Sequence, residues 1–321
     1  MIKVGIVGIG AISNSHIPSW MNVKEAKIVA LCDIRPEQME KWRGKLDANF
    51  YTDCDEMLRA EELDVLDICL PTYLHTEYAM KGFSHDLHVM CEKPISLSIE
   101  DIDILYDEAE KRKKTYMIGQ VVRFWQEYDY VKKVYESGEL GKLMSGKMSR
   151  LSGVPKWSWD GWLQDKKRSG LVPFDLHIHD ADFMVYAFGA PKNTIVHRAN
   201  DAMQDYFNVT YEYDGFFINA EAAWFNGRRP FSSGFIFQFE KGVIEFADGK
   251  LTVYKEENDE IITPFEDEGK ESIEVLGLPA NCGPMNEIRY FADCVLAGKS
   301  ADKIKRDELK TVLGLLNNIG K

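Results

Sequence analysis

Over the first 120 residues, short apolar runs alternate with longer stretches in which apolar residues recur at helical spacing. We interpret the runs as strands and the stretches as helices, which predicts right-handed crossovers and a parallel sheet. The expected strands cover residues 3–7, 26–32, 50–51, 64–70, 87–91 and 115–119. The expected helices cover residues 37–47, 53–59, 76–83 and 98–114, with Ser98 capping the last.

The pattern changes near Val121, after which strands follow one another with few helices between them. Asp214-Gly215 is typical of a hairpin turn between two of these strands. We therefore expect the α/β fold class with two domains. Residues 1–121 should form a Rossmann domain, which is a doubly wound parallel sheet. Residues 122–321 should form an α+β domain with a mainly antiparallel sheet. The second domain's expected helices cover 126–137, 175–188, 285–297 and 306–317, and its expected strands 143–151, 195–199, 206–213, 216–225, 232–240 and 242–246.

The first strand runs directly into a glycine turn, Gly8-Ile9-Gly10. Gly8 makes the tight turn, and Gly10, which has no Cβ, lets a phosphate approach the backbone closely. Ser13 holds the third small position of this motif. Together with Ala11 and Ile12 at the start of the next helix, the two glycines are the expected diphosphate-binding residues of a dinucleotide site.

The second strand ends in Asp33, about twenty residues after the turn, where an acidic residue meets the adenosine ribose. Its carboxylate can accept hydrogen bonds from both ribose hydroxyls and would repel a 2′-phosphate, so NAD is the expected cofactor. The Arg35 guanidinium can either cover the adenine or attract a phosphate. Because of the second role, NADP is the alternative cofactor.

Further polar residues follow the later strands of the first domain. Pro71, Thr72 and His75 come after one strand, and Glu92-Lys93-Pro94 comes after the next. Ligands of open α/β sheets lie beyond the carboxyl ends of the strands. We therefore count these residues, Lys93 included, among the cofactor-binding candidates.

Composition narrows the classes of partner. A net charge of −13 disfavours nucleic acid and anionic membranes, which would repel the chain at long range. At 321 residues the chain exceeds one typical core, and its N-terminus enters a strand at once, so we expect two domains in the cytoplasm without a signal peptide. Six scattered cysteines are expected to be reduced core thiols.

Several short motifs of the chain occur together in one known family. These motifs, in order along the chain, are Gly-x-Gly-x-x-Ser with His16, Pro71 with His75, Glu92-Lys93-Pro94, Gly119 with Arg123-Phe124, and Asp175-x-x-x-His179-x-x-Asp182. The chain resembles the glucose–fructose oxidoreductase, inositol dehydrogenase and rhizopine-catabolism (Gfo/Idh/MocA) oxidoreductases. This resemblance implies NAD(P)-dependent oxidation or reduction of a sugar, cyclitol or related polyol. It also implies a homodimer or homotetramer formed through an open C-terminal sheet.

The family pattern places catalysis on Lys93, Asp175 and His179. Taking a hydride from a carbinol carbon requires the hydroxyl proton to leave with it, and Lys93 and His179 are both candidates for the base. The residues leave open which of the two carries the proton. Substrate contacts are expected from these three residues together with Arg123 and Trp162 of the tryptophan-rich loop.

Three other interpretations of these residues exist. His177 and His179 would form a metal pair on a strand, but the helix expected here separates them, so no metal is expected. Tyr128-x-x-x-Lys132 has the spacing of short-chain dehydrogenases, but it follows the nucleotide fold, and both residues are expected on a helix surface. The second function considered is a nucleotide-sensing regulator without turnover.

Overall fold

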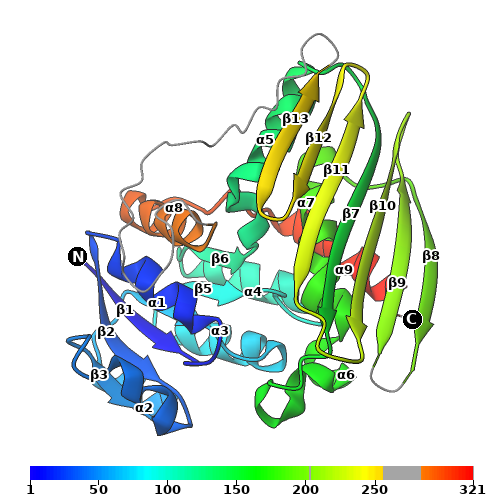
Figure 1. Cartoon of the computed structure of the whole chain (residues 1–321). Coiled ribbons are helices and arrows are strands. Elements are labelled where there is room, and N and C mark those ends of the chain that lie inside the picture. The colour runs from blue at the N-terminus through cyan, green and yellow to red at the C-terminus, as the bar shows by residue number, and fades with distance from the viewer. Residues whose placement is uncertain (202–203, 256–282, 321) are drawn as a thin grey trace. The chain divides into compact units, whose positions relative to one another are not determined.

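The computed structural model describes residues 1–201, 204–255 and 283–320, which divide into two compact units (Figure 1). The first unit contains residues 1–124 and, later in the chain, 283–310; the second contains the described residues of 125–255 and 311–320. We expected everything after residue 121 to belong to the second domain. In the structure, helix α8 (Gly283–Ala297) instead packs on helix α1 (Ser13–Met21) of the first unit.

The first unit is built on a six-stranded parallel sheet with strand order β3-β2-β1-β4-β5-β6. This order and the helices between the strands confirm the predicted Rossmann domain. The strands are β1 (Ile2–Val7), β2 (Ala26–Cys32), β3 (Asn49–Tyr51), β4 (Val65–Ile68), β5 (His88–Glu92) and β6 (Tyr116–Gly119). The helices between them are α1, α2 (Cys54–Ala60), α3 (His75–Ser84) and α4 (Glu100–Lys111).

Two predicted details of this unit are wrong. The helix expected over 37–47 is only two 3₁₀ turns, Pro36–Gln38 and Glu40–Trp42, and Gly44 at φ +75° turns the chain away from helical geometry. Ser98 does not cap α4, which begins two residues later. The Ser98 hydroxyl instead donates to the Glu100 carboxylate, so local side-chain bonding competes with the expected cap.

The second unit is built on a seven-stranded sheet with order β13-β12-β11-β7-β10-β9-β8. Only the β7–β10 pair is parallel, which confirms the mainly antiparallel sheet. Strand β13 was not expected, although Asp248 and Gly249, both at positive φ, form the turn that leads into it. The strands are β7 (Leu143–Gly153), β8 (Asn193–Asn200), β9 (Asp205–Glu212), β10 (Phe217–Phe225), β11 (Ser232–Phe239), β12 (Gly242–Ala247) and β13 (Lys250–Lys255).

Helices α5 (Gln126–Ser137) and α7 (Ile178–Phe188) cover one face of this sheet (Figure 1). The Tyr128 ring lies between Phe183 and Phe235, with ring centroids 4.9 Å and 5.0 Å away. Tyr128 is therefore buried in the core, and its predicted place on the helix surface is wrong. Its hydroxyl oxygen accepts a hydrogen bond from Arg150 at 3.0 Å.

The remaining elements are short apart from the last helix. Helix α9 (Arg306–Ile319) begins in the first unit and ends in the second. The short ones are α6 (Lys166–Ser169), 3₁₀ segments at Thr72–Leu74, Val121–Phe124 and Trp159–Gln164, and a π-helical segment at Pro173–His177. Among the helices that the structure describes, none combines the length and the apolar character needed to cross a membrane.

Candidate functional site

The glycine turn after β1 has the shape that a diphosphate requires. Gly8 has φ +89°, and a Cβ there would lie 2.6 Å from the carbonyl oxygen of Cys69, so only glycine fits. A Cβ on Gly10 would meet no described atom within 4 Å, which leaves the backbone open to a ligand. Helix α1 follows with no acidic residue in its first turn, and the first N–H groups of a helix have no acceptor within it. This cradle fits a cofactor diphosphate.

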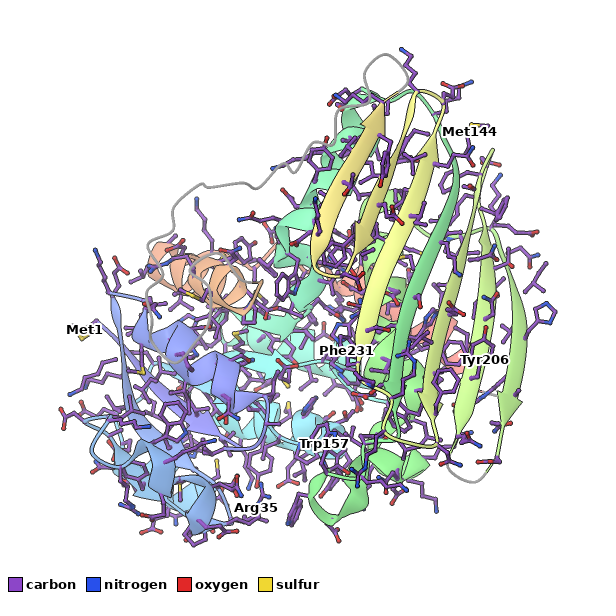
Figure 2. All side chains as sticks on the ribbon, in the orientation of Figure 1. Met1, Arg35, Met144, Trp157, Tyr206 and Phe231 are labelled. Carbon is purple, nitrogen blue, oxygen red and sulfur yellow. The ribbon has the colours of Figure 1, made fainter. Side chains whose placement is uncertain are left out.

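Asp33 follows β2 and points its carboxylate at the glycine turn. Its Oδ2 accepts the Ile9 N–H at 2.8 Å, and its Oδ1 accepts the Arg35 N–H at 2.8 Å. The Arg35 guanidinium (Figure 2) also lies over this carboxylate, at longer distances of 3.3 Å and 3.4 Å. The two backbone bonds fix the carboxylate, whereas the long guanidinium contacts are the ones that ribose hydroxyls would compete with.

His75 connects two loops at the carboxyl edge of the sheet. Its Nδ1 lies 2.6 Å from the carbonyl oxygen of Pro94, and its Nε2 lies 2.8 Å from that of Leu70. Burial lowers the pKa of His75, and a neutral imidazole can donate to only one of these carbonyls. Thr72 is also buried and Pro71 is half-buried. The predicted cofactor contacts of these residues stay predictions.

Glu92 and Lys93 lie where β5 ends. The buried Glu92 carboxylate is 2.8 Å from His16 Nε2 through Oε1 and accepts the Lys93 N–H at 3.1 Å through Oε2. Gly119 is the cross-strand partner of Glu92 on β6, and a Cβ on Gly119 would come within 3.2 Å of Oε1. Lys93 itself is half-buried at this edge.

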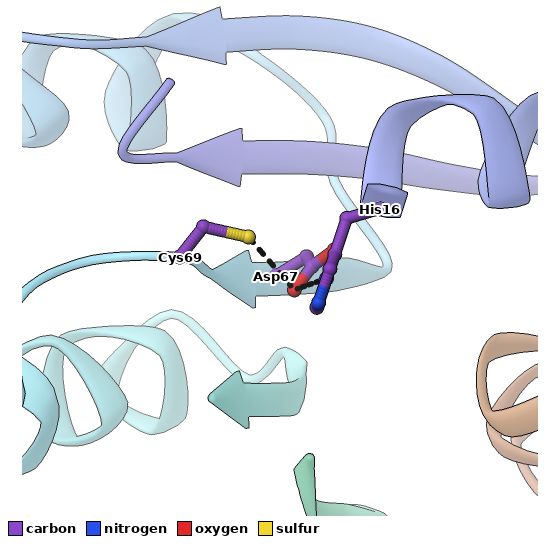
Figure 3. Close-up of side chains that lie close together, drawn as sticks. All are labelled: His16, Asp67 and Cys69. Carbon is purple, nitrogen blue, oxygen red and sulfur yellow. Dashed lines mark hydrogen bonds and ion pairs between the residues drawn. The ribbon is translucent and has the colours of Figure 1, made fainter. Parts of the chain in front are cut away.

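His16 and Asp67 belong to the same cluster, and sequence reasoning assigned neither of them to the site. His16 lies one turn into α1, and its Nδ1 is 2.9 Å and 3.1 Å from the two carboxylate oxygens of Asp67 (Figure 3). Burial disfavours the charged imidazolium, but the Asp67 carboxylate outweighs that penalty, so the pKa of His16 lies well above its usual value. The available signal was Asp67 itself, a carboxylate inside the apolar run 64–70.

The other two catalytic candidates lie in the second unit. Asp175 is in the π-helical segment and His179 is in the first turn of α7, and both are half-buried. Helix α7 is held to the sheet by a buried ion pair, in which Arg150 on β7 lies 2.9 Å from Asp180. π-Helical segments are frequent at functional sites, because they change the direction in which the following side chains point.

His177 is separated from His179 by its surroundings as well as by helical geometry. It is fully buried, and its Nε2 lies 2.5 Å from the Tyr211 hydroxyl. Burial, followed by the nearby Arg150, lowers the pKa of His177 to about 3, so this ring is neutral near pH 7. His177 therefore belongs to the core of the second unit.

The two remaining substrate candidates differ in exposure. Arg123 is fully buried and donates to the carbonyl oxygen of Lys303 at 2.8 Å and to the Glu308 carboxylate at 2.5 Å. A contact between this Nη1 atom and a substrate would require the ion pair to open. Trp162 is half-buried in the 3₁₀ segment Trp159–Gln164. Substrate contacts by either residue stay predictions.

Comparison with known proteins identifies both units. Residues 2–120 match the model of an oxidoreductase family with an NAD-binding Rossmann fold, and residues 128–245 match the GFO/IDH/MocA C-terminal domain. Glucose-6-phosphate 3-dehydrogenase of Bacillus subtilis is 30% identical over 59% of this chain and 54% of its own length. Myo-inositol 2-dehydrogenase of Thermotoga maritima is 26% identical over 59% of this chain and 55% of its own length.

The fold agrees with a solved structure over nearly the whole chain. Levoglucosan dehydrogenase, in complex with NADH and levoglucosan, aligns with a TM-score of 0.83 over 99% of this chain and 96% of that one, at 19% identity. The sequence matches to the two curated relatives span only about half of each relative's length. The chain belongs to the Gfo/Idh/MocA family of oxidoreductases, whose N-terminal domain is an NAD-binding Rossmann fold.

Proposed function

We propose that this protein is an NAD-dependent dehydrogenase that transfers a hydride between nicotinamide and a carbinol or carbonyl carbon of a sugar, cyclitol or related polyol. The observation that carries the proposal is the edge of the first sheet, where the Gly8–Gly10 turn, Asp33 and Lys93 all follow the carboxyl ends of parallel strands. The named activities of the relatives, on glucose 6-phosphate, myo-inositol and levoglucosan, support this substrate class.

Each group of residues has a separate task in this proposal. The glycine turn and the start of α1 hold the cofactor diphosphate, and Asp33 with Arg35 holds the adenosine ribose. The cofactor, when bound, accepts or supplies the hydride. Either Lys93 or His179 carries the hydroxyl proton, and Asp175 orients the substrate, with Arg123 and Trp162 as further substrate contacts. The half-buried position of Lys93 at the strand end supports its role.

The test is turnover of a panel of inositols, hexoses and anhydrosugars, followed through the absorbance of reduced nicotinamide. Lys93→Met is expected to lower turnover by about two to four orders of magnitude. NADH affinity should stay within several-fold of the parent, because phosphate and ribose contacts lie elsewhere. The control is Lys111→Met, at a 73% exposed side chain on α4, which should retain full activity. A Lys93→Met rate within threefold of the parent would remove Lys93 from the mechanism.

The same panel distinguishes the second candidate, a nucleotide-sensing regulator. Tight NADH binding without turnover of any polyol would favour the sensor. The retained Lys93, Asp175 and His179 favour the enzyme, because a sensor has no need for a proton-transfer group.

We also propose that the protein forms a homodimer or homotetramer through the face of the second sheet opposite α5 and α7. Large apolar side chains on three of its strands are exposed, namely Phe217, Ile236 and Ile195. A sheet face with exposed apolar residues is a common association surface.

A further inference from the structure

The carboxyl edge of the first sheet holds a buried histidine between two carboxylates. Asp67 lies within hydrogen-bond distance of His16 Nδ1, at 2.9 Å and 3.1 Å, and Glu92 lies 2.8 Å from Nε2. The side chain of His16 is 2% exposed, that of Asp67 0% and that of Glu92 10%. An ionised carboxylate only accepts hydrogen bonds, so both ring nitrogens must donate, and the ring is an imidazolium.

The remaining contacts of this cluster give both carboxylates further hydrogen-bond donors. Trp20 Nε1, also on α1, donates to Asp67 at 2.8 Å. The Cys69 thiol lies 3.8 Å from the other Asp67 oxygen, and burial raises the pKa of Cys69 to about 12, so it remains a thiol. Glu92 Oε2 accepts the backbone N–H of Lys93. Hydrogen-bond distances therefore connect His16 on α1 through Glu92 to the main chain of Lys93.

From this geometry we propose that His16 is a positioning residue for Lys93, acting through Glu92. Its positive charge holds the Glu92 carboxylate in the orientation that fixes the Lys93 backbone, and it prevents that carboxylate from acting on the lysine amine as an unopposed negative charge. The inference rests on the proposed role of Lys93. It adds a cationic residue that acts through Glu92 and sets the charge beside the proton-transfer group.

A metal ion is the competing interpretation. His16 Nδ1, an Asp67 oxygen and Cys69 Sγ all lie within 4.8 Å of one another. However, both Asp67 oxygens are already within hydrogen-bond distance of Nδ1, and Trp20 donates to one of them. The Glu92 contact on Nε2 completes a proton-bridged arrangement, in which each ring nitrogen of His16 has a carboxylate partner without a metal.

The charge state of His16 tests the proposal without any substrate. In the protein with ¹⁵N-labelled histidine, the His16 signals are those among the seven histidines that disappear in His16→Gln. We expect both ring nitrogens to be protonated at pH 7, where an ordinary histidine is mostly neutral. A neutral His16 ring at pH 7 would overturn the proposal. So would one metal ion per purified chain that is lost in His16→Gln.

The effect on Lys93 is the second readout. Competitive acetylation with mass spectrometry measures the pKa of the Lys93 amine in each variant. In His16→Gln this pKa should rise, because the Glu92 carboxylate, which interacts with both His16 and the Lys93 charge, is then no longer opposed by the imidazolium. In Glu92→Gln, which keeps the shape but removes the negative charge, it should fall. An unchanged Lys93 pKa in both folded variants would reduce the cluster to a structural role and overturn the proposal.

The control is His88→Gln, at the opposite end of β5, where His88 Nδ1 accepts the Thr115 N–H at 2.9 Å. It should leave the Lys93 pKa unchanged.

If His16→Gln does not fold, Glu92→Gln still decides the sign of the change in the Lys93 pKa. If no polyol is turned over, the proposed function fails while the labelling and resonance experiments still decide this inference. If turnover is found, its pH profile should move with the Lys93 pKa.

Discussion

Single side chains at the carboxyl edge of the first sheet are held by specific partners. Asp33 is fixed by two backbone N–H groups, and Glu92 by His16 and the Lys93 N–H. Glycine spacing and a strand-end acid were sufficient to predict the Gly8 turn and Asp33, because those constraints are local. The link between His16 and Glu92 joins residues 76 positions apart, and no local pattern encodes it.

Asp33→Asn should shift cofactor choice toward NADP. The amide keeps the shape of the side chain and can still accept the Ile9 N–H, but it removes the charge that repels a 2′-phosphate. NADH affinity should fall about tenfold or more, the effect of losing hydrogen bonds to a charged group. NADPH affinity should rise, with Arg35 available to the phosphate. Calorimetric titration measures both.

The control for this prediction is Asp47→Asn, at an exposed ion pair with Lys27, which should leave both affinities unchanged. Equal losses of NADH and NADPH affinity in Asp33→Asn would mean that Asp33 only supports the glycine turn.

The buried His177 should lower the unfolding free energy of the protein in mild acid. Its folded pKa of about 3 lies below the unfolded value of 6.5, so the unfolded chain binds the additional proton between these values. Relative to His177→Gln, the parent should therefore lose up to about 1.4 kcal/mol of unfolding free energy per pH unit below about 6.5. Urea unfolding of both proteins from pH 7 to pH 5 measures the difference. A difference that stays constant over this range would contradict a neutral buried His177.

At the scale of elements, strand and helix order was predictable, whereas element ends and long-range packing were not. The Rossmann strands stand out because apolar runs buried on both faces are easily recognised. Strand β13 was missed although it is as long as the predicted β12, and the Asp248-Gly249 turn before it is the signal that could have identified it. The packing of α8 on α1 was missed for a different reason. An amphipathic helix shows which face is apolar but not which element covers that face.

Phe291→Ala should destabilise the first unit through the α1–α8 contact. Phe291 is fully buried, and its ring meets Trp20 edge to face with centroids 6.2 Å apart. Loss of a buried phenyl ring costs about 3–5 kcal/mol of unfolding free energy. The control on the same helix is Leu296→Ala, at a side chain that is 52% exposed, which should cost under about 0.5 kcal/mol. Equal urea midpoints for the two variants would show that α8 does not stabilise this unit.

For the whole molecule, alternation in the second sheet separates a covered face from an open one. Strand register places Ile236, Lys147, Asn219, Thr210 and Ile195 in one row across five strands. Ile236 and Ile195 are 42% and 43% accessible, the three residues between them are polar, and the row continues from Ile236 to Glu245 on β12. The open sheet was expected from the family resemblance, and the register of the strands now gives the residues of its uncovered face.

Ile236→Asp should therefore break the proposed dimer or tetramer without unfolding the chain. A carboxylate placed in the row beside Lys147 would lose its water upon association, which costs several kcal/mol per interface, whereas in the monomer it remains in water. Light scattering after size exclusion should show the parent as an oligomer and the variant as a monomer, with equal circular dichroism. Ile104→Asp, at a 52% exposed position on α4 of the first unit, is the matched control and should leave the oligomer intact. If the parent is monomeric at micromolar concentration, or if both variants behave alike, the open face is not the association surface.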